Sequence, residues 1–269
     1  MSSLSRGNGV PDFGVMVPRP RVLNALRAFG CRPVLLFGPS GSGKSVAASQ
    51  YCAGLCKQTV WIDAQGAFFP AERIVSRVSS RLDGAGSGSL NDPAESMSFA
   101  DLMDRASQTL ELMDSPDGLV VVLDDVHGPC SRQASLEIVG LARTLLTHNS
   151  QLLITTRDLS AWRDTDLCEF GLIGGDDLAL DVGEARDLLL MAGYRSLAPD
   201  VEQLRSLSAG HPALFVVLSS QASRHGLDSD VSRVASLDAW IERLLRADLS
   251  QDDVQVLLRA DLLLTGRAN

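Results

Sequence analysis

No apolar run in this 269-residue sequence approaches the ~18–20 residues that a membrane-spanning helix needs, and residues 1–9 contain no apolar stretch of signal length. Basic charge is not in excess either, because 24 Lys and Arg residues stand against 33 Asp and Glu, for a net charge of −9. The basic residues are scattered and form no run. Nucleic-acid backbones are held by clustered Lys and Arg. These absences argue against a membrane segment and against a DNA-contacting groove on this chain.

Cysteine is also sparse, and none of the five residues forms a C-x-x-C pair or a metal-binding spacing. Cys52 and Cys56 fall on one helix face, but two thiols without His or further Cys make a poor zinc site. We therefore expect buried, reduced thiols in a cytoplasmic protein. The five are Cys31, Cys52, Cys56, Cys130 and Cys168.

The most informative segment that is present is a complete phosphate-binding loop, G-x-x-x-x-G-K-[ST], between an apolar strand and a helix. Its glycines allow consecutive N–H groups to point at a β-phosphate, at the N-terminus of the following helix. Lys44 can reach the β- and γ-phosphates, and Ser45 can offer its hydroxyl to Mg²⁺. The sequence therefore predicts that a nucleoside triphosphate is bound by Gly38, Pro39, Ser40, Gly41, Ser42, Gly43, Lys44, Ser45 and Val46.

Two later strands end in polar side chains. The continuous apolar run at 119–123 is typical of a strand buried on both faces of a parallel sheet, and it ends in Asp124 and Asp125. Asp124 is the candidate to hold Mg²⁺, through water, and Asp125 could orient or deprotonate the attacking water. The next strand ends in Thr155-Thr156-Arg157. Since parallel strands end at the same edge of a sheet, we expect Arg157 to point toward the γ-phosphate and to distinguish ATP from ADP.

Structural roles stay open for these residues. The acidic pair could form a strand-end turn, and Arg157 could cap its strand at the surface. His127 could contact phosphate, water or a carboxylate, or could serve local structure alone. Pro212 opens a helix after Gly210 and His211, and proline suits a first helical turn without any functional role.

Strands alternate with helices up to residue 180, and only helical periods follow. This order predicts an α/β fold, with a parallel-sheet P-loop NTPase domain at 19–180 after a flexible leader at 1–18, and a smaller all-helical subdomain at 181–234. A Gly/Ser-rich insert is expected at 83–89. Expected strands lie at 32–37, 59–63, 119–123, 151–155 and, at an edge, 169–173; expected helices lie at 19–29, 46–57, 71–82, 93–113, 131–146, 183–192, 199–208, 212–224, 237–246 and 250–259.

Taken in order, these motifs resemble the signal-transduction ATPases with numerous domains (STAND), and most of all the large ATP-dependent LuxR-type transcriptional regulators, of which the maltose activator is the familiar relative. The resemblance covers most of the chain from about residue 18. It rests on Arg19-Pro20-Arg21, the phosphate loop, Val60-Trp61-Ile62-Asp63, Val122-Leu123-Asp124-Asp125-Val126-His127, Leu153-Ile154-Thr155-Thr156-Arg157 and Gly210-His211-Pro212-Ala213-Leu214.

The resemblance implies that ATP or ADP binds with Mg²⁺, that Arg19 lies near the adenine, and that Pro212 packs against the base. His211 stands where relatives often carry an apolar residue. The resemblance further implies that residues 235–269 begin a truncated winged-helix domain. The chain is then expected to be part of a longer regulator that contacts DNA only through a C-terminal domain absent from this chain.

The functional hypothesis that results is a nucleotide switch. ADP holds a closed resting state, ATP permits self-association, and slow ATP hydrolysis resets the protein. The alternative is an AAA-like remodelling ATPase acting on DNA or protein, which requires an arginine finger such as Arg132 or Arg143. A small P-loop kinase needs an arginine-rich lid, whereas the arginines of 183–269 are scattered. A binding module that never hydrolyses nucleotide also stays open, although the acidic pair weighs against it.

Overall fold

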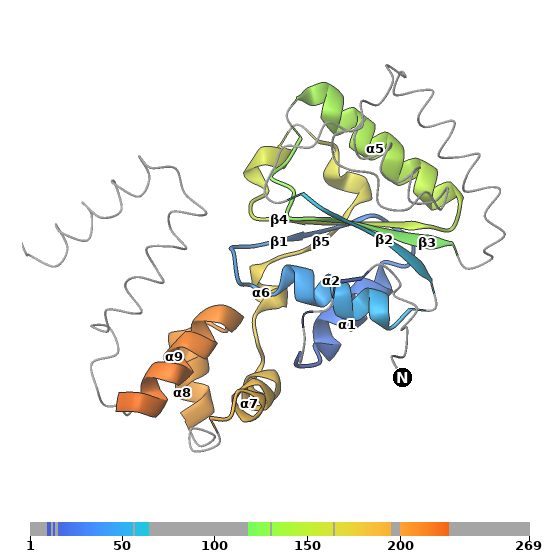
Figure 1. Ribbon diagram of the computed structural model, residues 1–269. Helices are drawn as coiled ribbons and strands as arrows, with labels where there is room; N and C mark the ends of the chain where they lie inside the picture. The colour runs from blue at the N-terminus through green and yellow to red at the C-terminus, as the bar shows by residue number, and fades with distance from the viewer. Residues whose placement is uncertain are drawn as a thin grey trace, which may run out of the picture. The chain divides into compact units, whose positions relative to one another are not determined.

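The computed structural model describes residues 10–11, 13, 16–55, 57–64, 118–129, 131–163, 165–194 and 200–225 (Figure 1). It divides the chain into two units. The first comprises Met1–Gly38 and Lys44–Leu178, and the second comprises Pro39–Gly43 and Ala179–Asn269. The middle of the phosphate loop thus groups with the second unit.

The first unit contains a five-stranded sheet in which every pair of neighbouring strands is parallel. The strand order is β2-β3-β4-β1-β5, so the strand expected at an edge, β5, lies at one. All five expected strands are confirmed, and with them the P-loop NTPase fold. The sequence did not predict that β4 separates β1 from β3. The strands are β1 Val34–Phe37, β2 Gln58–Asp63, β3 Leu119–Asp124, β4 Gln151–Thr156 and β5 Gly171–Ile173.

Helices cover both faces of this sheet, α5 on one face and α1 and α2 on the other (Figure 1). Ser131 caps the N-terminus of α5, where its side chain accepts a hydrogen bond from the backbone N–H of Ala134. The four-residue helix α6 and two short 3₁₀ turns were not predicted. The helices expected at 71–82 and 93–113 and the insert at 83–89 lie outside the described residues. The bounds are α1 Pro20–Ala28, α2 Lys44–Ala53, α5 Arg132–Thr147 and α6 Gly175–Leu178.

Two hydrophobic clusters form on the two faces, because successive side chains of a strand point in opposite directions. Along β3, residues 119, 121 and 123 belong to the cluster that includes Ile138 and Leu145 of α5. Residues 120 and 122 belong to the cluster that includes Ala48 and Cys52 of α2. The continuous apolar run in the sequence is therefore explained by burial on both faces.

The second unit contains α7, α8 and α9, at three of the helical periods expected from the sequence. Asp181 and Glu184 form a reciprocal capping box at the start of α7. The helices share a core that includes Leu189, Leu204 and Phe215. The winged-helix start at 235–269 lies outside the described residues, and the domain boundaries stay predictions. The bounds are α7 Val182–Met191, α8 Val201–Leu207 and α9 Pro212–His225.

The expectation of buried thiols is confirmed for Cys52 and wrong for two others, since Cys31 is half-buried and Cys168 is exposed. Cys56 and Cys130 lie outside the described residues. Among the helices that the structure describes, none has the length and apolar character to cross a membrane.

Candidate nucleotide site

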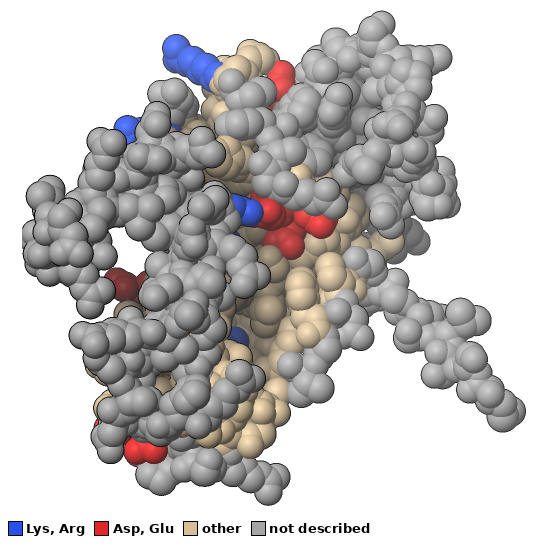
Figure 2. All heavy atoms as spheres, turned by 60° about the vertical axis from the view of Figure 1, so that its left-hand side comes forward, with Lys and Arg blue, Asp and Glu red and all other residues tan. Residues whose placement is uncertain are grey.

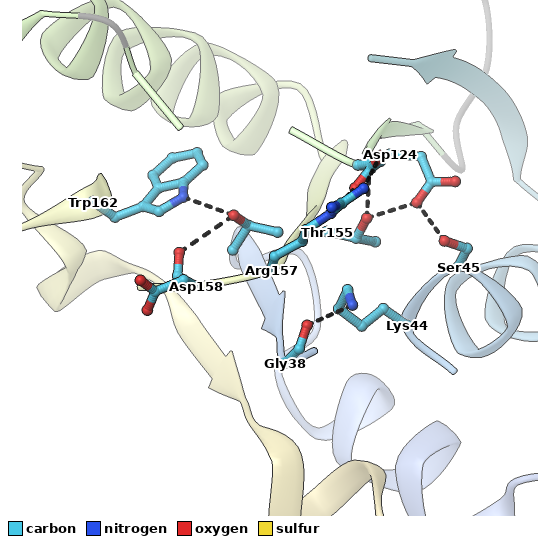
Figure 3. A network of polar contacts seen from close by, with 10 residues as sticks. Gly38, Lys44, Ser45, Asp124, Thr155, Arg157, Asp158 and Trp162 are labelled. Carbon is cyan, nitrogen blue, oxygen red and sulfur yellow. Dashed lines mark hydrogen bonds and ion pairs between the residues drawn. The ribbon is translucent and has the colours of Figure 1, made fainter. Parts of the chain in front are cut away.

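The phosphate loop joins β1 to α2 and begins at Gly38, whose N–H donates to the backbone oxygen of Thr156 at 3.3 Å. Gly41 and Gly43 have φ angles of 80° and 90°, which L side chains rarely adopt. Lys44 is only 7% exposed, and its Nζ donates to the carbonyl oxygen of Gly38 at 2.6 Å. The predicted loop is therefore in place, with its lysine folded against the loop's own backbone (Figure 3).

Ser45, Asp124 and Thr155 meet at the carboxyl edge of the sheet (Figure 3). The hydroxyls of Ser45 and Thr155 donate to the same carboxylate oxygen of Asp124, Oδ1, at 2.7 and 2.6 Å. The pairing of Ser45 with Asp124 brings together the two residues that the sequence nominated for Mg²⁺. Mg²⁺ in nucleotide sites is held by one or two protein oxygens together with phosphates and water, so this pair suits it.

Burial raises the pKa of the Asp124 carboxyl above its usual value, against the lowering effect of the hydrogen bonds from Thr155 and Ser45. The carboxylates of Asp63 and Asp125 raise the same pKa further by repulsion. Asp63 ends β2 directly beside Asp124 in the parallel register. A divalent cation would relieve this local excess of negative charge.

Asp125 and Arg157 form an ion pair. Arg157 Nε donates to Asp125 Oδ1 at 3.2 Å, and Arg157 Nη2 donates to Oδ2 at 3.4 Å. Both side chains are about one-third exposed, at 32% and 28%. Asp125 has a φ of 53°, and its N–H donates to Thr155 Oγ1 at 2.8 Å, which holds this unusual backbone in position. The residue nominated to activate water is thus paired with the residue nominated to read the γ-phosphate.

The strand order explains how these two residues meet. Since β4 lies between β1 and β3, Arg157 follows a strand that neighbours both the phosphate loop and the acidic pair. Thr156, directly before Arg157, accepts a hydrogen bond at its Oγ1 from Nε1 of the fully buried Trp162 at 3.2 Å (Figure 3). In the space-filling view, acidic side chains gather near the centre of the face seen, with a basic side chain against them (Figure 2).

Arg19, nominated for the base side, is 3% exposed. Its guanidinium donates from Nη2 to the carbonyl oxygen of Leu178, the last residue of α6, at 2.6 Å. Gln50 of α2 accepts from the Arg19 N–H at 3.1 Å and donates to the Val17 carbonyl oxygen at 2.6 Å. The segment around Arg19 is therefore attached to the helix that follows the phosphate loop, and the Arg19 guanidinium is engaged with backbone.

In the second unit, the start of α9 contacts the middle of the phosphate loop. His211 Nε2 lies 3.1 Å from the carbonyl oxygen of Ser40, and the N–H of Ala213 donates to the carbonyl oxygen of Gly41 at 3.3 Å. Pro212 occupies the first position of α9, as its sequence context predicts.

Sequence reasoning missed Thr155 and Gln50. Threonine is ordinary in a strand and glutamine is ordinary in a helix, so neither carries a local signal. The position of Thr155, two residues before the strand-end Arg157, was the one available hint. His127 is exposed at the same edge, and Val46 lies in the first turn of α2.

Comparison with protein families gives one match: residues 33–169, about half of the chain, match the AAA domain (dynein-related subfamily). No curated protein matches the sequence. The match spans the phosphate loop, the acidic pair and Arg157.

Solved structures share the fold at low sequence identity. A STAND protein with a tetratricopeptide repeat sensor from Pyrococcus horikoshii aligns with a TM-score of 0.54 at 17% identity, over 91% of this chain and 34% of that one. A Walker-type ATPase of Pyrococcus abyssi gives a TM-score of 0.58 at 14% identity, over 91% of this chain and 76% of that one. The Aeropyrum pernix ORC1 protein, solved in complex with DNA, gives a TM-score of 0.51 at 16% identity, over 88% of this chain and 70% of that one. The chain thus spans about a third of the length of the STAND protein it matches.

Proposed function

The chain belongs to the AAA domain family of P-loop ATPases, and on that premise we propose that it is an ATP/ADP-operated switch that hydrolyses ATP slowly. One observation carries the proposal. Asp125, the carboxylate proposed to activate water, is paired with Arg157, whose guanidinium is proposed to bind the γ-phosphate. Both carboxylate oxygens of Asp125 accept from Arg157, so they are not available to a water molecule and hydrolysis is slow while the pair persists.

The γ-phosphate of ATP competes for Arg157 in this scheme, and ADP does not. ATP therefore releases Asp125, whereas ADP leaves the pair intact. A ligand moves such an equilibrium only by its different affinity for the two states, and the γ-phosphate supplies that difference here. The ion pair thus makes one arginine responsible both for distinguishing the nucleotides and for timing hydrolysis.

The remaining roles are proposed from the sequence motifs, and the contacts of Ser45, Asp124 and Thr155 support theirs. The loop Gly38–Ser45 with Val46 binds phosphates through backbone N–H groups and Lys44. Ser45 and Asp124 would hold Mg²⁺, which neutralises developing phosphate charge when it is bound. Thr155 fixes the Asp124 carboxylate through a 2.6 Å hydrogen bond. Arg19 and Pro212 are proposed for the base side on the STAND resemblance.

The finer assignment, to a LuxR-type STAND transcriptional regulator, rests on the motif order in the sequence. In that assignment ADP holds a closed resting state and ATP permits self-association. The protein would contact DNA only through a further C-terminal domain, and it would work in the cytoplasm. The likeness to the P. horikoshii STAND protein is compatible with this role, although it concerns the fold alone.

The test is to denature freshly purified protein and identify the released nucleotide by chromatography. Stoichiometric ADP, followed by slow exchange and slow single-turnover hydrolysis of added ATP, would support the switch. An empty protein that hydrolyses ATP rapidly at steady state would contradict it.

The family match also favours a second candidate, a remodelling ATPase that acts on DNA or protein. Such enzymes complete their site with an arginine from a neighbouring subunit. Of the two arginines proposed from the sequence, Arg143 is engaged with Glu169 at 2.5 Å within its own chain. A hydrolysis rate per molecule that rises steeply with protein concentration, and falls in the Arg132→Ala variant, would favour this candidate over the switch.

A further inference from the structure

The middle of the phosphate loop, Pro39–Gly43, is here called the loop apex. Two consecutive carbonyl groups of the loop apex are bonded to the first turn of α9. His211 Nε2 reaches the oxygen of Ser40, and the Ala213 N–H reaches the oxygen of Gly41. The loop apex and α9 belong to the same unit of the structure. The loop apex is therefore attached to α9 through its backbone carbonyl groups.

The ring of His211 has a defined tautomer. The N–H of Leu214 donates to His211 Nδ1 at 3.3 Å, so Nδ1 carries a lone pair. Nε2 of the neutral ring then carries the proton and donates it to the Ser40 carbonyl oxygen. One side chain thus caps its own helix with one nitrogen and holds the loop apex with the other.

These two bonds fix the planes of two peptide groups. Because the peptide bonds are trans, the N–H of Gly41 points opposite to the carbonyl of Ser40. Holding the carbonyl toward α9 directs that N–H away from α9. The N–H of Ser42 closes a turn onto the Pro39 oxygen at 3.2 Å. Backbone N–H groups of this kind of loop are what cradle phosphate, so α9 sets the orientation of part of the cradle.

The approach of the loop to α9 requires small residues on both sides. A side chain at position 41 would place its Cβ 2.6 Å from Ala213 Cβ and 3.1 Å from His211 Cε1. Gly41 also has a φ of 80°. The close approach of the loop to α9 therefore depends on the small size of Gly41 and Ala213, and not on a single side-chain rotamer.

We propose that His211 is a positioning residue for the phosphate loop, through which phosphate bound at the loop apex orders the first turn of α9. This inference rests on the proposed function, because it assumes that the loop binds the phosphate chain of a nucleotide. It assigns the second unit a direct response to phosphate that needs no contact with the base. Inorganic pyrophosphate, which has no base, is the appropriate probe.

The test compares three substitutions in the full chain. His211→Phe keeps a ring but removes both nitrogens, His211→Gln restores an N–H donor, and His148→Phe makes the same change at the C-terminal end of α5, away from the loop. Loss of one hydrogen bond should weaken Mg²⁺-pyrophosphate binding by about three- to tenfold in His211→Phe. His211→Gln should recover most of the affinity, and His148→Phe should not change it.

Amide hydrogen exchange supplies a second readout that a purely structural role would not move. Pyrophosphate should slow exchange of the Ala213 N–H in the wild type and in His211→Gln, and should leave it unchanged in His211→Phe. Equal affinity and equal protection of Ala213 in all variants would overturn the role of His211 and leave the nucleotide site standing. If His211→Phe does not fold, His211→Gln decides: protection of Ala213 like that of the wild type supports the inference, and its absence overturns it. Wild-type protein that binds neither ATP nor pyrophosphate would instead refute the proposed function itself.

Discussion

The two edges of the sheet in the first unit are both rich in polar side chains, but these side chains are used differently. At the carboxyl edge three of the bonds join one side chain to another: Ser45 to Asp124, Thr155 to Asp124, and Arg157 to Asp125. Lys44 and Thr155 also contact the backbone there, at the Gly38 oxygen and the Asp125 N–H. At the amino edge most of the bonds end on the backbone. Lys57 donates to the backbone oxygen of Asn149, and Arg32 donates to the backbone oxygens of Cys168 and Glu169. Gln151 donates to the backbone oxygen of Arg32, and the Ser150 hydroxyl accepts from the Leu119 N–H.

The difference distinguishes side chains that support the fold from side chains that can bind a ligand. At the amino edge the bond from the Leu119 N–H to Ser150 is buried, so its loss would leave an unpaired N–H, which is costly. The bonds of Lys57 and Arg32 there are exposed, and water can replace them. A side chain bonded to another side chain can exchange its partner for a ligand. The carboxyl edge is therefore the edge whose hydrogen bonds can be replaced by phosphate and Mg²⁺. Four pairs of substitutions test this contrast.

The largest effect is expected from the two lysines. Lys44 and Lys57 both donate to a backbone oxygen, of Gly38 and of Asn149. Lys44→Ala should weaken ATP binding roughly 100-fold, because an ammonium–phosphate contact is lost. Lys57→Ala should leave ATP affinity unchanged. Isothermal titration calorimetry measures both, and equal affinities in the two variants would remove the phosphate role from Lys44.

The second contrast concerns two non-glycine residues with positive φ, Asp125 and Asn149, both at 53°. Asp125→Asn should slow single-turnover ATP hydrolysis by about 100-fold while ATP still binds, since a general base is lost. Asn149→Gly keeps the left-handed backbone accessible and should not change the rate. A normal hydrolysis rate in Asp125→Asn would exclude Asp125 from water activation.

The third contrast compares two arginine–carboxylate pairs. Arg157→Ala should narrow the ratio of ATP to ADP affinity by about tenfold, because one charged contact to the γ-phosphate is lost. Arg143→Ala, which breaks the exposed pair with Glu169, should leave the ratio unchanged. Nucleotide titrations of both variants give the ratios. A ratio that stays at the wild-type value in Arg157→Ala would make this arginine structural.

The smallest effects are expected on stability, with opposite signs. Ser150→Ala should lower the melting temperature by a few degrees, since the buried Leu119 N–H loses its acceptor at a cost of about 1–2 kcal/mol. Asp124→Asn should raise the melting temperature slightly in the absence of nucleotide and Mg²⁺. The raised pKa of Asp124 means that its charged form is disfavoured in the folded state.

The sign of the Asp124→Asn effect can be checked against pH. The gain in stability should be full well above the raised pKa of Asp124 and should shrink as the pH falls through that pKa. It should vanish below the usual value of 3.8, where the wild-type carboxyl is neutral in both the folded and the unfolded state. Calorimetric melting at a series of pH values measures this. A loss of stability in Asp124→Asn at neutral pH would show that its hydrogen bonds outweigh the burial of charge.

Much of this edge could be predicted because its signals are local. The loop's glycines, Lys44 and Ser45 are contiguous, and the apolar run before Asp124 identifies a strand buried on both faces. Thr155 could not be predicted, because its role depends on β4 lying between β1 and β3, and strand order has no signature in any single segment. The pairing of Asp125 with Arg157 depends on the same order. Helix α6 was not predicted, because four residues are too few to show a helical period.

The alternation of side chains along β3 has a consequence for divergence among sequences. The described residues of the first unit form two hydrophobic compartments that share no side chain, one beneath α5 and one beneath α1 and α2. Volume-conserving exchanges in the α5 compartment leave the packing of α2, and with it the position of Lys44, undisturbed. Apart from Trp162, which belongs to this compartment and donates to Thr156 beside Arg157, the residues beneath α5 are thus free to change, or to be redesigned for heat resistance, while the residues that support Lys44 are kept.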